Sequence, residues 1–148
     1  MAQQISEIQV NYTSPAYQDE VVAITSSMEA YIHFIEIWDM GTIDMQESFY
    51  MLLLNRANQV LGYYKVSTGT LSGTMVDPKH IFSVALKGMA SFVILAHNHP
   101  TGSLKASEED KKLTKKLAEG GELLDIKILD HIILSRRGYY SFADEGLI

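Results

Sequence analysis

Two histidines stand one residue apart in the stretch HNHPTG, at residues 97–102. Side chains two positions apart on an extended chain point the same way, so His97 and His99 are expected to project side by side. Ser107 and Asp110 follow shortly after the Pro-Gly turn. Two imidazoles and one carboxylate suit Zn²⁺ and leave its fourth coordination position open for water. The spacing therefore predicts a catalytic metal site formed by His97, His99 and Asp110.

The helix that should carry Asp110 begins at Ser107, a residue type favoured at helix starts. Leu113 and Leu117 lie three and seven residues after Asp110 and form the apolar stripe of this helix. Asp110 shares that stripe, so it is expected to point inward, unlike the charged residues around it. An inward carboxylate needs a positive charge or a metal ion nearby, because an unpaired buried charge is costly.

Two apolar strands should bring the histidines into place. Residues 91–96, SFVILA, predict a short buried strand that leads directly to His97. Residues 47–54, ESFYMLLL, are apolar on both faces and predict a central strand, followed by a hairpin turn at 55–58 and a strand at 59–67. A strand that leaves the sheet at its end is a usual place for ligand sites in open α/β folds.

Hydrophobic periodicity and helix-capping residues predict the other elements. These are strands at 5–12, 125–134 and 139–142, a short helical turn at 19–24, and helices at 27–38, 78–88 and 107–120. The core-facing residues expected on the first two helices are Met28, Tyr31, Ile32, Ile35 and Trp38, and then Ile81, Phe82, Ala85 and Leu86. Strands interleaved with helices predict an α/β domain over residues 1–148, with a mixed central sheet flanked by helices on both faces.

The composition limits the possible classes of function. The chain has 148 residues, of which 47% are hydrophobic and 20% charged, typical of one globular domain. It has no cysteine, which excludes disulfides and thiolate metal ligands. A net charge of −6 disfavours tight non-specific binding to nucleic acid. The apolar runs are too short to cross a membrane and the sequence opens without a secretory signal pattern, so we expect a cytoplasmic protein with no membrane partner.

The motif HNHPTG followed by Ser107-x-x-Asp110 resembles the signature of the JAMM (MPN+) metalloproteases. It is most similar to their RadC-like JAB branch, whose motif is HNHPSG, with Thr101 here in place of the usual serine. The similarity extends from about residue 20 to 148, through the segments ESFYMLLLN, STGT, VDPKHIFSVAL and LDHIILS. The resemblance implies a JAB/MPN fold, with an architecture like that of the cytidine deaminases.

The resemblance also implies roles for individual residues. His97, His99 and Asp110 would bind one Zn²⁺ per chain, Glu47 would activate the zinc-bound water as general base, and Ser107 would stabilise the oxyanion. The implied activity is hydrolysis of a peptide or isopeptide bond in a protein or peptide substrate. Glu47 alternates with apolar residues along its strand, which favours an inward side chain.

The residues alone leave several alternatives open. Asp110 could be only the capping partner of Ser107, and the histidines could be hydrogen-bonded residues of a turn. Two histidines and a carboxylate also describe the ligand set of Fe(II) oxygenases. Asp130-His131 interrupts an apolar strand, so one of the pair must face a polar partner. A structural histidine is predicted there, with a supporting contact to the zinc site as the alternative.

A further alternative is a DNA-repair-associated or protein-binding module without protease activity. Many RadC-family proteins carry a DNA-binding helix-hairpin-helix segment ahead of this domain. In this chain the RadC-like similarity begins too early for such a segment to fit, so we expect none. Neither the substrate nor the oligomeric state follows from the sequence.

Overall fold

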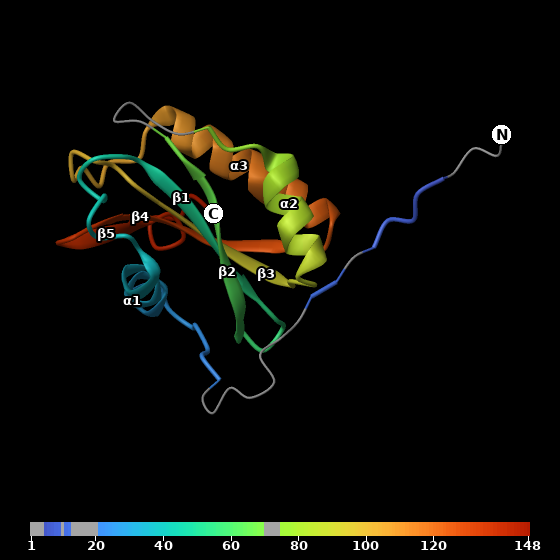
Figure 1. Ribbon diagram of the computed structural model, residues 1–148. Coiled ribbons are helices and arrows are strands. Elements are labelled where there is room, and N and C mark those ends of the chain that lie inside the picture. The colour runs from blue at the N-terminus through green and yellow to red at the C-terminus, as the bar shows by residue number, and fades with distance from the viewer. Residues whose placement is uncertain (1–4, 10, 13–20, 70–74) are drawn as a thin grey trace.

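A five-stranded sheet forms the centre of the computed structural model, which describes residues 5–9, 11–12, 21–69 and 75–148. The strands lie in the order β2-β1-β3-β4-β5 (Figure 1). Only the pairing of β3 with β4 is parallel, and the other three pairings in this sheet are antiparallel. The predicted mixed sheet is therefore confirmed. The strands are β1 (Ser48–Leu54), β2 (Val60–Thr68), β3 (Phe92–Asn98), β4 (Lys127–Ser135) and β5 (Gly138–Ser141).

Helices cover both faces of this sheet, as predicted (Figure 1). Helix α1 (Ser27–Ile37) packs on one face, and α2 (Pro78–Lys87) and α3 (Glu108–Leu123) pack on the other. Each face has its own apolar layer, because alternate residues of every central strand point to opposite sides. Every residue of β1 is buried, which confirms a central strand covered on both faces.

The predicted helix starts are confirmed in atomic detail. The Ser26 side chain accepts a hydrogen bond from the Glu29 backbone N–H at the start of α1. Asp77 accepts one from the Lys79 N–H at the start of α2, and Pro78 occupies the first helical turn. These side chains satisfy N–H groups that have no partner within the helix.

The inward face of α1 differs from the predicted stripe. Ala30, Phe34 and Trp38, spaced four residues apart, are buried against the sheet. Met28 and Ile32 are 51% and 47% exposed, so their predicted core positions are wrong. Small Ala30 lets the helix approach the sheet, and the two aromatic side chains fill the space beyond it. On α2, Ile81 and Ala85 are buried, whereas Leu86 is 48% exposed and its predicted core position is also wrong.

The predicted strand at 5–12 is absent from its described residues. This segment extends away from the domain (Figure 1), and Ile5 and Ile8 are 94% and 89% exposed. Alternating apolar residues form a strand only where a neighbouring strand accepts their backbone hydrogen bonds. The Tyr12 hydroxyl donates to the Leu61 carbonyl at 3.0 Å, a contact that joins this segment to β2.

The predicted helical turn at 19–24 is wrong at residues 21–24, and residues 19 and 20 lie outside the described part of the chain. Ala23 forms an antiparallel bridge with Gln59, and the Ile24 N–H donates to the Asn58 carbonyl. The segment is therefore extended because it pairs with the hairpin that joins β1 to β2.

Helix α3 continues through Gly120 and Gly121 to Leu123, so its predicted end is three residues early. A side chain at Gly121 would collide with the carbonyl oxygen of Ile126. The Ile126 N–H also donates to the Gly121 carbonyl at 2.8 Å. This glycine therefore allows the chain that enters β4 to approach the helix, and it does not end the helix.

Candidate metal centre

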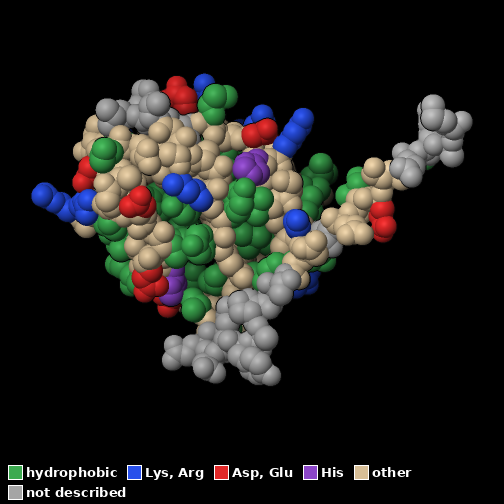
Figure 2. Space-filling view, viewed as in Figure 1, with side chains coloured by type: hydrophobic (Ala, Val, Ile, Leu, Met, Phe, Trp, Pro, Cys, Tyr) green, Lys and Arg blue, Asp and Glu red, His purple; other side chains and the backbone are tan. Residues whose placement is uncertain are grey.

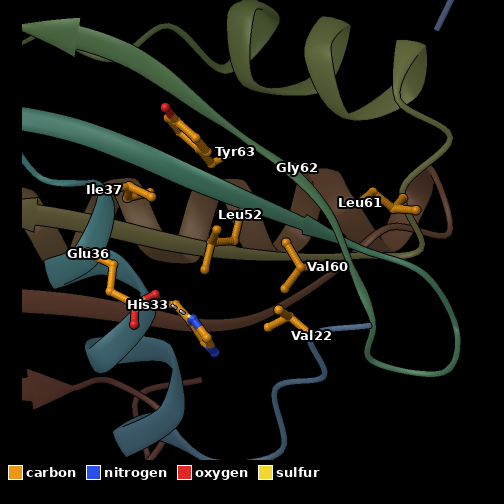
Figure 3. Close-up of a pocket in the computed structure, with 9 residues that line it drawn as sticks. All are labelled: Val22, His33, Glu36, Ile37, Leu52, Val60, Leu61, Gly62 and Tyr63. Atoms are coloured by element: carbon orange, nitrogen blue, oxygen red, sulfur yellow. Dashed lines mark hydrogen bonds and ion pairs between the residues drawn. The ribbon is translucent and has the colours of Figure 1, made fainter. Parts of the chain in front are cut away.

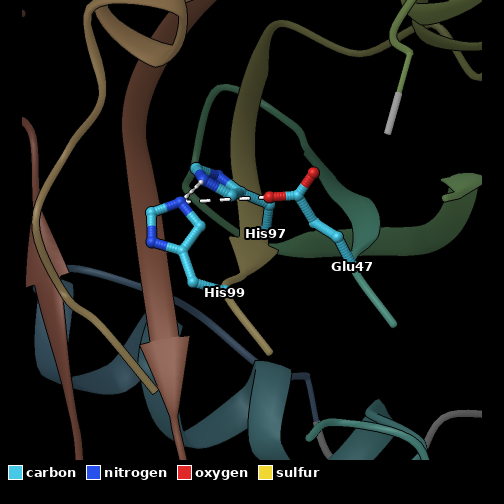
Figure 4. A group of neighbouring side chains, drawn as sticks. All are labelled: Glu47, His97 and His99. Carbon is cyan, nitrogen blue, oxygen red and sulfur yellow. Dashed lines mark hydrogen bonds and ion pairs between the residues drawn. The ribbon is translucent and has the colours of Figure 1, made fainter. Parts of the chain in front are cut away.

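The pairing of β1 with β3 determines where Glu47 and the histidines lie. Phe49 is opposite His97 in this antiparallel ladder. Glu47, two residues before Phe49, comes opposite His99, two residues after His97, and both side chains point to the same face as His97. Figure 4 shows the three side chains converging from the ends of these two strands. His97 is 2% exposed, and the Glu47 and His99 side chains are 12% and 17% exposed.

The nitrogen and oxygen atoms of these residues lie close together. The Nε2 atoms of His97 and His99 are 3.0 Å apart. The two carboxylate oxygens of Asp110 lie 3.3 Å from these nitrogens, Oδ1 from His97 and Oδ2 from His99. Glu47 Oε1 is 3.9 Å from His99 Nε2. Glu47, His97 and His99 form a group that could hold a metal ion, since one ligand atom from each lies within 4.8 Å of the others.

The first turn of α3 holds Asp110 through a capping box. The Ser107 Oγ accepts from the Asp110 N–H at 3.0 Å, and Asp110 Oδ2 accepts from the Ser107 N–H at 2.9 Å. Asp110 is therefore the capping partner of Ser107, and the same carboxylate also faces both histidines. Capping fixes the orientation in which Asp110 reaches them. Accepting a hydrogen bond uses only a lone pair of Ser107, so its hydroxyl proton can still be donated.

Burial and hydrogen bonding act in opposite directions on the ionisable groups. Burial alone would raise the pKa of Asp110, but hydrogen bonds with His97 and His99 outweigh it and hold that pKa well below its usual range. The hydrogen bond to Asp110 raises the pKa of His99, against the effect of burial. Asp110 thus remains ionised although its side chain is only 17% exposed, and its negative charge favours a cation at this point.

Asn98 positions the segment that carries Glu47, a role that the sequence analysis missed. Its side chain is fully buried and points away from the neighbouring histidines, because strand residues alternate. The amide nitrogen donates to the carbonyls of Ile43 and Gln46, at 2.7 and 3.0 Å, and the amide oxygen accepts from the Ser48 N–H at 2.8 Å. The sequence does contain one indication of this role. Asn98 is a polar residue between two site residues, at a position where strand alternation predicts a core side chain.

Asp130 and His131 both have polar partners, whereas the sequence required only one of them to have one. Asp130 accepts hydrogen bonds from the Ser141 hydroxyl and the Ala143 N–H, and burial raises the pKa of its carboxyl. His131 is fully buried and contacts His97 and Thr114, and burial lowers its pKa well below the usual value. No pattern in the sequence indicates a role for Thr114, because a threonine on a helix has no distinctive spacing.

A separate cavity of about 350 Å³ lies between α1 and the edge strand β2 (Figure 3). None of the predicted site residues lines it. Its polar groups include His33 and Glu36, which form an ion pair at 3.2 Å. The cavity is lined by Val22, His33, Glu36, Ile37, Leu52, Val60, Leu61, Gly62 and Tyr63.

Basic and acidic side chains are interspersed on the face seen in Figure 2. Lys111 and Glu108 on α3 form an ion pair at 3.1 Å. Within the part of the chain that the structure describes, no helix is both long and apolar enough to cross a membrane.

Comparison with known proteins identifies the family of the chain. Residues 22–147 match the RadC-like JAB domain family. A UPF0758 protein of Flavobacterium johnsoniae is 44% identical over 124 residues, which cover 84% of this chain and 53% of that protein. A UPF0758 protein of Desulforamulus reducens is 44% identical over 110 residues, covering 74% of this chain and 48% of the relative. The chain thus spans about half the length of these curated relatives. The protein belongs to the RadC-like JAB domain family.

Proposed function

We propose that the protein is a zinc-dependent hydrolase that cleaves a peptide or isopeptide bond. The observation that carries this proposal is the spacing of three donor groups. His97 Nε2 and His99 Nε2 are 3.0 Å apart. Asp110 Oδ1 lies 3.3 Å from the first of these nitrogens, and Asp110 Oδ2 lies 3.3 Å from the second. Three donors on one tetrahedral zinc ion, with bonds of about 2.0–2.1 Å, would lie about 3.3–3.4 Å apart. Membership of the RadC-like JAB domain family supports the same assignment.

Two carboxylates compete for the third ligand position, and the distances favour Asp110. Its two oxygens reach both histidines at 3.3 Å, whereas the nearest Glu47 oxygen is 3.9 Å from His99. The capping box also fixes the Asp110 carboxylate, so binding a metal there costs little side-chain entropy. Glu47 is therefore assigned to the water and not to the metal.

The remaining residues divide the chemistry between them. A bound zinc ion would lower the pKa of a coordinated water to about 7. The Glu47 carboxylate, next to the histidines but outside the ligand set, would accept a proton from the attacking water and pass it to the leaving amine. Ser107 donates its hydroxyl proton to the developing oxyanion, beside the N–H groups that begin α3.

The test begins with metal analysis of protein purified without added metal. We expect about one zinc ion per chain, and iron instead of zinc would support the oxygenase alternative. The protein is then incubated with peptide and isopeptide libraries, before and after chelation and after zinc is restored. Cleavage that chelation abolishes and zinc restores would support the proposal. A fully zinc-loaded protein that cleaves neither library would favour a binding module instead.

Substitution Ser107→Ala should reduce both stability and activity. It removes the acceptor for the Asp110 N–H, which should lower the free energy of unfolding by about 1 kcal/mol. It also removes an oxyanion donor, which should lower kcat by about 10²-fold. Thermal denaturation and steady-state kinetics measure the two effects. Ser107→Asp is the matched control, since aspartate also caps helices but, when ionised, has no proton to donate. If it restores kcat as well as stability, Ser107 has no role as a donor.

A further inference from the structure

Four polar groups form a continuous hydrogen-bonded chain beneath His97. The chain runs from the Asp110 carbonyl to the Thr114 hydroxyl, across the His131 ring and on to His97 Nδ1. The successive distances are 2.7, 2.6 and 2.7 Å. Thr114 is 1% exposed, and the His97 and His131 rings are 2% and 0% exposed. These groups are therefore out of contact with water, so each must find its hydrogen-bond partner within this hydrogen-bonded chain.

The Thr114 hydroxyl sets the direction of the chain. A backbone carbonyl can only accept, so Thr114 donates its single proton to the Asp110 carbonyl. It has no second proton to give to His131, so it must accept from His131 Nδ1. His131 therefore carries a proton on Nδ1.

His131 in turn sets the tautomer of His97. Its ring contacts the Phe49 and Phe142 rings, with centroids 5.3 and 4.8 Å away, and its two nitrogens contact His97 and Thr114, neither of which is a carboxylate. Such an environment disfavours a second proton, so His131 Nε2 presents a lone pair. It then accepts from His97 Nδ1, which leaves Nε2 as the His97 nitrogen that faces His99 and Asp110 and could bind a metal.

His99 reaches the same state by a shorter route. Its Nδ1 lies 2.9 Å from the Ser103 carbonyl, which can only accept, so Nδ1 carries a proton and Nε2 is the nitrogen left to bind a metal. Both histidines of the site thus carry a proton on Nδ1, but different groups accept it. His99 uses a backbone carbonyl, whereas His97 needs a second histidine and a threonine from two other elements, β4 and α3.

We propose that Thr114 and His131 are positioning residues that hold His97 in the tautomer able to bind a metal through Nε2. This inference rests on the metal-binding part of the proposed function, but it does not depend on peptidase activity. Outer partners of this kind typically change metal affinity by about 10–100-fold. The loss of either residue should therefore weaken zinc binding without removing any ligand.

The first test reads the tautomers directly in the wild-type protein. Two-bond ¹⁵N–¹H correlation spectra distinguish a ring protonated on Nδ1 from one protonated on Nε2. We expect His131 to carry its proton on Nδ1 both with zinc and after its removal, and His97 to carry its proton on Nδ1 in the zinc-loaded protein. A His131 proton on Nε2, or protons on both nitrogens, would overturn the proposal.

The second test compares Thr114→Val with Thr114→Ser. Valine preserves the shape of threonine but cannot accept from His131, whereas serine keeps the hydroxyl. We expect competition with a chelator to show zinc affinity about 10–100-fold weaker for Thr114→Val and nearly unchanged for Thr114→Ser. Equal affinities in the two variants would overturn the proposal. If Thr114→Val does not fold, the wild-type spectra still decide the question.

Substitution His131→Gln tests the same chain from its centre. A glutamine amide can donate to Thr114 and accept from His97, so it preserves the direction of the chain, whereas His131→Phe preserves only the volume. Zinc affinity should therefore be higher in His131→Gln than in His131→Phe, and the reverse order would contradict the inference.

A wild-type protein that binds zinc with these variant effects but cleaves no substrate would overturn only the hydrolase proposal. One that binds no zinc would overturn both.

Discussion

Substitution Glu47→Gln is expected to lower kcat by about 10²–10⁴-fold while the protein keeps its zinc. Glutamine has nearly the same shape as glutamate, but its amide cannot accept the proton of the attacking water at neutral pH. Glu47 lies 3.9 Å from His99 Nε2, close enough to meet a water in the site. Because the proton moves only as the reaction proceeds, the loss should appear in kcat and not in KM.

The measurement pairs steady-state kinetics with metal analysis of the same sample. Glu36→Gln is the matched control, since Glu36 is a mostly exposed acid that contacts His33 on α1. That variant should keep both its zinc and its activity. Full zinc and full activity in Glu47→Gln would remove Glu47 from the mechanism. A loss of zinc in Glu47→Gln would identify Glu47 as a ligand instead of a base.

The sequence predicted the parts of the site that depend on local periodicity. Alternation along an extended chain places His97 and His99 on one face, and the helical repeat turns Asp110 inward with Leu117. The same rules predicted the central strand at 48–54 and the helix starts at Ser26 and Asp77. In each case the geometry depends only on residues close together in the sequence, so the sequence of one segment is enough to predict it.

The sequence did not predict contacts that depend on the pairing of distant segments. Thr114 and His131 meet only because α3 packs on β4, and Asn98 meets Ile43 only because the chain before β1 crosses the end of β3. The same limit explains the wrong strand at 5–12. Its apolar alternation is real, but no periodicity shows whether a partner strand is present.

Replacing a metal ligand should weaken zinc binding more than replacing Thr114 or His131, which only position His97. Replacing His97 or His99 by alanine is expected to weaken zinc binding by more than about 100-fold, the upper end of the range for outer partners. Chelator competition measures the affinity, and mass spectrometry measures the zinc that remains bound. His80→Ala is the matched control, because His80, on α2, contacts the Tyr64 hydroxyl and none of the site side chains Glu47, His97, His99 and Asp110. Unchanged affinity in the His97 or His99 variant would show that the ligand assignment is wrong.

Substitution Asp110→Asn separates the capping role of this residue from its proposed role as a zinc ligand. Asparagine keeps an oxygen that can accept from the Ser107 N–H, so the start of α3 and the melting temperature of the zinc-free protein should change little. It loses the negative charge that faces both histidines, so zinc affinity should fall by more than about 100-fold, as in the histidine variants. If Asp110→Asn instead keeps its zinc and Glu47→Gln loses it, the metal is held by Glu47, His97 and His99. Asp110 would then be a capping residue alone, because the two carboxylates are the only acids among the described residues that contact His99 Nε2.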